Sequence, residues 1–400
     1  MIKIENKRKC CGCTACASIC PQKCIKMLPD EEGFLYPKIQ QDKCVDCGAC
    51  NKVCPVDNAP AANVSKIESY AMRTKEDDVL KRSTSGGFVT PLADWVLQRG
   101  GVLCAAAYME DFTVAHILVD SDNEKNLMPR IRGSKYVQSD LKDCFLQIRR
   151  KLAECRLVCF VGTTCQVNGL KAFLGRENDN LITVDLVCHG VPSPKLWKKY
   201  LNYQRDKYGF DIVDASFRNK TYGYHGHTMM LKFENGKTYT GSGRVDAMMK
   251  SFMCEIASRP ICYQCPFKKL NRCSDFTVFD CWHFEELVSG VKDDDRGYTN
   301  VFIQSSKGLK VFDEIKHRYE YYTVNLEKAI EKDGKMVLNA ARPHKERDNY
   351  LITLDQEPLM EHIQRFIPIQ KSDVWVERSK KYLYNAKLAK LLKSLRAGKH

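Results

Sequence analysis

Two runs of cysteine with identical spacing constrain this 400-residue chain more than any other feature. Each run has the form Cys-x2-Cys-x2-Cys-x3-Cys-Pro, and the first ends at Pro21 and the second at Pro55. The cysteines of the two runs are Cys10, Cys13, Cys16 and Cys20, and Cys44, Cys47, Cys50 and Cys54. Because 10 of the 21 cysteines fall between Cys10 and Cys54, the stretch is better suited to binding metal than to packing a core.

This spacing is typical of modules with two [4Fe-4S] clusters, in which three cysteines of a run hold one cluster and the fourth reaches the other. We therefore predict one cluster on Cys10, Cys13, Cys16 and Cys54 and a second on Cys44, Cys47, Cys50 and Cys20. Three thiolates around one cube need a tight turn, which Gly12 and Gly48 permit. Zinc is the competing interpretation, but its sites usually combine two separated pairs of ligands. Cys11 and Cys24 lie outside the repeat and are interpreted as packed thiols.

Composition and charge indicate the cellular compartment of the protein and the kind of partner that it binds. So many cysteines indicate a reducing compartment, and no apolar signal region precedes them, so we expect a cytoplasmic protein. No stretch approaches the roughly 18 consecutive apolar residues of a membrane helix, so no membrane span is expected. The net charge of +14 is spread widely and is locally dense only from Glu377 to His400. That tail is interpreted as a solvated helix face or as a surface attracting an acidic redox protein, such as a ferredoxin or flavodoxin, and not as a nucleic-acid site.

The chain is too long for one core, which predicts a small module joined to a larger body. Residues 1–60 form the predicted ferredoxin-type module, and a linker follows it. Strands and helices then alternate, which predicts a mixed body of the α+β or α/β class. We divide that body into an N-terminal part at 67–150, a C-terminal part at 151–325 and a helical, basic tail at 326–400. A good hairpin turn at Glu234-Asn235-Gly236 indicates antiparallel strands within the second part.

Two segments of the body place hydroxyls and glycines at the start of a predicted helix. They are Ser83–Gly87, before an apolar helix at 88–98, and Gly162–Gln166, after a buried strand at 157–161. Free N–H groups at such positions suit a phosphate, and an ordinary helix cap is the simpler explanation of the first segment. No G-x-G-x-x-G follows a strand, so the ordinary dinucleotide fingerprint is missing.

A further cysteine pair, Cys262 and Cys265, lies far from the two runs. Together with the distant Cys165 and Cys188 it could complete a third tetrathiolate site. The alternative is that these cysteines are simply buried.

The body resembles the coenzyme F420 hydrogenase/dehydrogenase beta subunits, a family that includes 7-hydroxymethyl chlorophyll a reductase. The resemblance spans roughly residues 69–310. It rests on Ser83–Gly87, Arg132–Ser139, Gly162–Gln166, Asp185–Ser193, and Cys262-x2-Cys265-Pro266 with Ser274-Asp275. An N-terminal double-cluster module joined to such a body is a familiar arrangement in this family.

The resemblance implies a bound FAD beside a third [4Fe-4S] cluster. A flavin accepts two electrons and releases them singly, so it can join hydride chemistry to one-electron clusters. The implied flavin contacts are Ser85, Gly86, Gly87, Gly133, Ser134, Lys135 and Gln138. The implied inner cluster lies on Cys165, Cys188, Cys262 and Cys265, with Cys273 and Cys281 as rival ligands. His189 and His283 are the candidates for catalytic proton delivery, and hydrogen-bonded structural histidines are the alternative.

Two departures from the family pattern bear on the substrate. The family's Gly-Thr-Pro-Cys is Gly162-Thr163-Thr164-Cys165 here, and its Gly-Asp-Phe-Trp-Gly is Phe279-Asp280-Cys281-Trp282-His283. The lost glycines add bulk, which disfavours F420 as the substrate. We predict an enzyme, an iron–sulfur flavoprotein oxidoreductase passing single electrons between its clusters and an FAD that reduces or oxidises a small organic substrate. The alternative is an electron-transfer beta subunit of a hydrogenase- or dehydrogenase-type complex, exchanging hydride with a soluble carrier such as F420.

Overall fold

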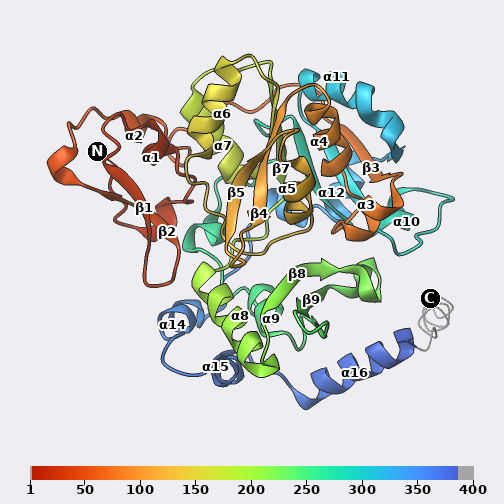
Figure 1. Cartoon of the computed structure of the whole chain (residues 1–400). Helices are drawn as coiled ribbons and strands as arrows, with labels where there is room; N and C mark the ends of the chain where they lie inside the picture. Colours follow the sequence, from red (N-terminus) through yellow and green to blue (C-terminus); the bar gives the residue numbers. More distant parts are fainter. Residues whose placement is uncertain (1, 386–400) are drawn as a thin grey trace. The chain divides into compact units, whose positions relative to one another are not determined.

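A computed structural model describes residues 2–385, which form two compact units (Figure 1). The first comprises residues up to 195 together with 258–342, and the second comprises 196–257 together with the described residues from 343. The predicted boundaries at 150 and 325 do not separate these units, because strands from both sides of residue 150 join one sheet. The predicted tail at 326–400 is likewise divided at residue 342, and its last fifteen residues lie outside the described residues.

The predicted cluster module is a repeat in structure as well as in sequence. A 3-10 turn, η1 (Lys7–Lys9) or η2 (Gln41–Lys43), precedes each cysteine run. A short helix then follows, α1 (Ala15–Ile19) or α2 (Ala49–Lys52). The residues before these helices, Thr14 and Gly48, are both left-handed, with φ of 60° and 72°. Strands β1 (Ile25–Pro29) and β2 (Leu35–Ile39) form an antiparallel hairpin between the runs.

The body of the first unit is an eight-stranded mixed sheet with the order β13-β3-β12-β11-β7-β6-β4-β5. The strands are β3 (Glu68–Thr74), β4 (Val102–Tyr108), β5 (Val114–Val119), β6 (Val158–Thr163), β7 (Leu181–Leu186), β11 (Phe276–Cys281), β12 (Tyr298–Ile303) and β13 (Tyr319–Thr323). Strands β4, β6, β7 and β11 run parallel, and the other four pair antiparallel at its two sides. The parallel strands are buried on both faces, which explains their continuous apolar sequences.

Helices cover both faces of this sheet. One face packs against α4 (Val89–Leu97), α5 (Glu124–Ile131) and α11 (Ser306–Ile315) in an extended apolar cluster. The other face packs against α6 (Cys144–Ala153) and α7 (Thr164–Leu174), and against α10 (Phe284–Leu287) and α12 (Leu326–Lys332). The short helices α3 (Asp77–Arg82) and α13 (Lys335–Leu338) complete the unit. The predicted mixed α/β body is therefore confirmed.

The second unit contains a three-stranded antiparallel sheet, β10-β9-β8, and helices. Its elements are α8 (Pro194–Tyr208), which begins two residues before the unit, β8 (Ile212–Asn219), β9 (Thr228–Phe233), β10 (Thr238–Ser242), α9 (Ala247–Met253), α14 (Arg347–Ile352), α15 (Leu359–Phe366) and α16 (Lys371–Asn385). The predicted hairpin at Gly236 joins β9 to β10. Buried Asp246 caps α9 and accepts hydrogen bonds from two tyrosines, and burial raises its pKa to about 6. Among residues 2–385, no helix combines the length and apolar character needed to cross a bilayer.

Candidate redox site

Two cavities in the cluster module are lined by the two predicted crossover sets of cysteines. The first, of about 310 Å³, is lined by Cys10, Cys13, Cys16 and Cys54. The second, of about 350 Å³, is lined by Cys20, Cys44, Cys47 and Cys50. Both spaces are partly open to solvent. The fourth cysteine of each run therefore faces the cavity of the other run, as a crossover requires.

The thiols of these cavities would bind a cluster as thiolates. Burial raises the pKa of Cys16 to about 12. Such a thiol becomes a ligand when a nearby positive charge stabilises its thiolate, and the iron of a cluster supplies that charge.

The two cysteines outside the repeat lie next to the predicted ligands. The Cys24 sulfur is 3.4 Å from the Cys20 sulfur, and its side chain lines the second cavity. Cys11 lines the first cavity, and interactions with the thiols of Cys13 and Cys165, together with burial, shift its pKa, which lies well above the usual value. Cys11 therefore joins the cluster module to a cysteine of the body.

The four cysteines predicted for an inner cluster gather at one edge of the sheet. Cys165 is the second residue of α7, which directly follows β6, and Cys188 follows β7. Cys262 lies in the turn η5 (Pro260–Gln264), and Cys265 is the residue that ends this turn. Burial, and then the charges of Cys165 and Cys265, raise the pKa of Cys188 to about 12, and the charges of Cys188, Cys165 and Cys265 raise that of buried Cys262. Because all four thiols interact with one another, the set forms one group.

The rival ligands lie in other surroundings. Lys171 and Asp185 are the charged neighbours of buried Cys273, which packs in the apolar cluster under α6 and α7. Cys281 packs in the cluster under α10 and α12, where burial and the charge of Asp333 raise the pKa of its thiol. The structure therefore groups neither thiol with Cys165.

A buried ion pair connects the two segments that carry Cys165 and Cys188. The Arg272 guanidinium lies 2.8 Å from the Asp185 carboxylate, and the two side chains are 2% and 0% exposed. Arg272 also donates to Thr164 Oγ1 at 2.6 Å, and Ser274 Oγ donates to Asp185 at 2.7 Å. The network joins the end of β7, which leads to Cys188, to the start of α7, which carries Cys165. It thereby fixes the relative positions of two predicted ligands.

The two loops predicted to bind flavin meet beside β12. The backbone N–H of Ser134 donates to Thr84 Oγ1 at 2.8 Å. Ser85 Oγ and the N–H of Gly86 contact Thr299 Oγ1 at 2.7 and 2.8 Å. A Cβ at Gly86 would collide with the Met72 carbonyl on β3 and lie 2.8 Å from the backbone N of Thr299, so this position requires glycine. Gly133 has a φ of 82°, and a Cβ there would have no neighbour within 4 Å.

Positive charge collects at this pair of loops. Within residues 2–385, Nε of Arg132 is buried without a hydrogen-bond partner. Burial and then the charge of Arg82 lower the pKa of Arg132, and the charges of Asp94, Glu76 and Glu124 partly offset this effect. Helix α4 starts just after Gly87, and no side chain caps its first N–H groups. An anion with several oxygen atoms would satisfy these donors together. Sequence reasoning missed Arg132, although it directly precedes Gly133.

Two other residues predicted to contact flavin have different partners. Lys135 Nζ donates to the carbonyls of Ile131 and Gly133, at 2.8 and 3.1 Å. Because Ile131 is the last residue of α5, Lys135 caps the C-terminus of this helix. Burial lowers the pKa of Lys135 to about 7. Gln138 Oε1 accepts from the backbone N–H of Leu35 in the cluster module, at 3.0 Å, and from Arg259. Gln138 therefore faces the cluster module, a contact that its position in the sequence does not reveal.

The structure places His283 away from these loops. Its Nδ1 lies 2.7 Å from Oδ1 of buried Asp333, and Asn300 Nδ2 donates to the other oxygen of that carboxylate at 3.2 Å. Adjacent strand residues point to opposite faces, so Asn300 and Thr299 face different sides of the sheet. The His283–Asp333 pair lies on the side of α12, while Ser85 contacts Thr299. His189 directly follows Cys188 in the sequence, and its side chain is exposed.

The fold and the cysteine cavities define an iron–sulfur protein with a double-cluster module in front of a mixed α/β body. Residues 9–58 match the 4Fe-4S dicluster domain, and residues 155–329 match the family described as the C terminus of the beta subunit of coenzyme F420 hydrogenase/dehydrogenase. The chain therefore combines a 4Fe-4S dicluster domain with the C-terminal domain of the coenzyme F420 hydrogenase/dehydrogenase beta subunits and is an iron–sulfur oxidoreductase.

Comparisons with individual proteins add little to this assignment. The search of curated proteins gave no match. A chain of the F420-reducing [NiFe] hydrogenase complex from Methanosarcina barkeri is similar in structure, with 16% identity and a TM-score of 0.43. The similarity covers 76% of this chain and 92% of that chain.

Proposed function

We propose that the chain is a flavin-dependent iron–sulfur oxidoreductase. In this proposal, single electrons pass between a redox protein, the module clusters, an inner cluster and FAD, where an organic substrate is reduced or oxidised. The observation that carries the proposal is the position of Cys11, which lines the first cavity with Cys13 and whose thiol interacts with Cys165. One thiol separates a ligand of the first module cavity from a ligand of the inner group, which supports a short path for electrons between them.

The loops beside β12 support the flavin part of the proposal. FAD carries a diphosphate, and the chain offers it the uncapped start of α4 and the guanidinium groups of Arg132 and Arg82. Gly133 leaves the backbone open to close approach. When bound, FAD supplies the exchange between two-electron and one-electron chemistry. The inner cysteines and the flavin loops both lie at the ends of strands of one sheet.

Anaerobic purification with iron, sulfide and flavin analysis tests the proposal directly. We expect about twelve irons and about one FAD per chain, because three [4Fe-4S] clusters contain four irons each. The Arg132→Ala variant should bind FAD roughly 10- to 100-fold more weakly, since hydrogen bonds to charged groups contribute about 1.5–3 kcal/mol. Its iron content should not change. Lys125→Ala, which removes an exposed cation from the same region, is the matched control.

Two results would contradict parts of this proposal. Protein with about twelve irons and no flavin after FAD addition would refute the flavin site. Wild-type FAD affinity in Arg132→Ala would refute the placement of the diphosphate.

The family match favours a second candidate, an electron-transfer beta subunit that exchanges hydride with a soluble carrier such as F420. The purified chain alone distinguishes the two. Given reduced ferredoxin, it should reduce F420 if it is such a subunit. If the chain is instead an enzyme of the first kind, F420 should not oxidise the reduced protein, and an organic substrate of another class should do so.

A further inference from the structure

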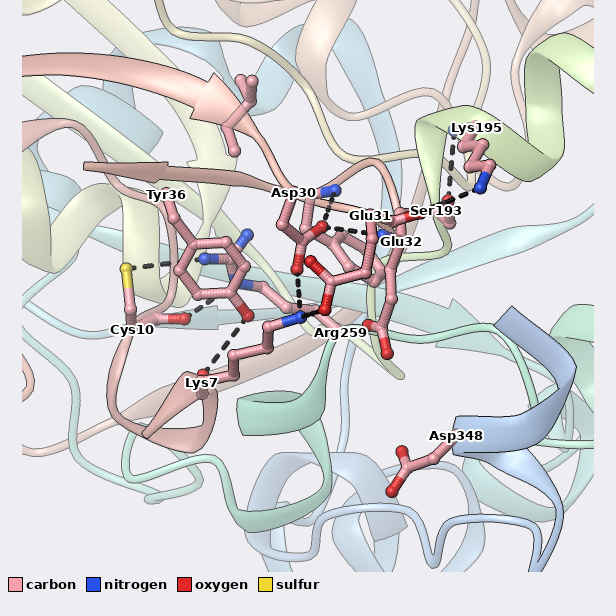
Figure 2. Close-up of polar contacts among 12 residues, drawn as sticks. Lys7, Cys10, Asp30, Glu31, Glu32, Tyr36, Ser193, Lys195, Arg259 and Asp348 are labelled. Atoms are coloured by element: carbon pink, nitrogen blue, oxygen red, sulfur yellow. Dashed lines mark hydrogen bonds and ion pairs between the residues drawn. The ribbon is translucent and has the colours of Figure 1, made fainter. Parts of the chain in front are cut away.

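Arg259, a residue of the body, reaches into the cluster module and contacts Cys10 (Figure 2). Its Nε donates to the Cys10 carbonyl at 2.7 Å, and its Nη2 lies 3.5 Å from the Cys10 sulfur. Its guanidinium carbon lies 3.9 Å from the centre of the Tyr36 ring. The side chain is fully buried. Arg259 is therefore a cation held without water against a predicted cluster ligand.

The positive charge of Arg259 is not neutralised by a neighbouring acid. Among the described residues no carboxylate forms an ion pair with it, and its remaining polar contact is Gln138 Oε1, at 3.3 Å. Asp30, which is drawn with it in Figure 2, pairs with Lys7 at 2.7 Å. The charge of Arg259 therefore acts on Cys10 at close to full strength in a medium that screens it weakly.

The second cavity offers its cluster no comparable cation. Of the residues that line it, Asp46 alone is charged, and its charge is negative. Cys47 on its rim is exposed to solvent, which screens charges there. Each cavity thus offers four cysteine ligands, but the charges around the two sets of ligands differ.

We propose that Arg259 raises the reduction potential of the cluster held by Cys10, Cys13, Cys16 and Cys54 above that of the second cluster. Reduction adds negative charge to a cluster, and a buried guanidinium bonded to a ligand sulfur stabilises that charge. Net charge, hydrogen bonds to sulfur and exposure are the properties that set cluster potentials. Electrons then collect at the cluster beside Cys11, which contacts the inner ligand Cys165. The inference rests on the proposed function only in requiring both module clusters.

A second contact ties the same residue to the inner group. The carbonyl of Arg259 accepts a hydrogen bond from the backbone N–H of Cys262 at 2.9 Å. One short segment therefore carries both the cation for the first cluster and a ligand of the inner site. Arg259 acts through Cys10, so it is a positioning residue and not a catalytic one.

Redox titration of the anaerobic protein, followed by electron paramagnetic resonance, tests the proposal. In Arg259→Gln, the equilibrium constant for reducing one module cluster should fall tenfold or more, a shift of about 59 mV for one electron. The other module cluster should keep its potential. The shift should remain in a Cys47→Ala background and vanish in a Cys13→Ala background, which identifies the cluster. Arg8→Gln, which removes an exposed cation two residues before Cys10, is the control and should shift neither potential.

Gln138→Glu provides an independent variant if Arg259→Gln fails to assemble. It keeps the size of the side chain and the acceptor for Leu35, and it adds a carboxylate against Arg259. The same cluster should again become harder to reduce. Unchanged potentials in both variants, with normal iron content, would overturn the role of Arg259 alone. Iron-free wild-type protein would overturn the proposed function and this inference with it.

Discussion

The crossover of the two cysteine runs can be tested by counting iron in two double variants that share one substitution. Cys54 lines the same cavity as Cys13, whereas Cys47 lines the other one. We therefore compare Cys13→Ala/Cys54→Ala with Cys47→Ala/Cys54→Ala. The first pair removes two ligands from one cluster, and the second pair removes one ligand from each cluster.

The expected magnitudes follow from four thiolates and four irons per cluster. Relative to the wild type, Cys13→Ala/Cys54→Ala should lose about four irons, and Cys47→Ala/Cys54→Ala should lose about eight. If each run instead held its own cluster, the two losses would be exchanged. The single Cys54→Ala variant is the reference and should lose about four irons. Cys155→Ala, which removes an exposed cysteine outside all three groups, should lose none.

The assay is iron and acid-labile sulfide analysis of anaerobically purified protein, with paramagnetic resonance of the reduced samples. Resonance signals show whether the remaining iron is in intact clusters. A loss of about eight irons from Cys13→Ala/Cys54→Ala together with about four from Cys47→Ala/Cys54→Ala would refute the crossover and the assignment of the two cavities.

Three further predictions concern the inner group and the contact of the body with the cluster module. Cys262→Ala should lose about four irons and keep the module clusters, whereas Cys273→Ala should keep all of its iron. Equal iron contents in the two variants would argue against the inner site. Gly169→Ala places a Cβ within 2.7 Å of a buried cysteine side chain of the module, so it should destabilise the protein by about 1–3 kcal/mol, measured as earlier thermal bleaching of visible absorbance. Asp185→Ala leaves the Arg272 guanidinium buried and unpaired, so it should lower the free energy of unfolding by about 3–5 kcal/mol, measured by thermal unfolding. Asp185→Asn should lower it by less. Equal losses in the two variants would show that the charge of the pair is unimportant.

The body shows where sequence reasoning succeeds. Strands β6 and β7 were predictable because parallel strands buried on both faces form short, continuous apolar runs. Helix α4 was predictable because glycines bound an apolar, helix-like segment. The pairing of β3 with β12 and β13 was not predicted, because hydrogen bonds between strands more than 200 residues apart leave no periodic signal.

Individual residues of the candidate site show the same division. The loop of Ser85 and the loop of Ser134 were grouped by family resemblance, and the structure brings them together. Gln138 belongs to the same sequence segment as Ser134, yet its amide is used by the cluster module. Arg259 has no motif around it that indicates a contact with Cys10, because that contact joins segments 249 residues apart.

The amino-acid sequence by itself determined the cluster module, since ligands of one cluster follow each other within a few residues and short spacing is sufficient to describe their geometry. Only the tertiary structure decided which cysteines share a cavity, which thiol joins the module to the body, and which arginine lies against a ligand. Those relations depend on distances between separate elements, and such distances arise only when the sheet and its helices pack.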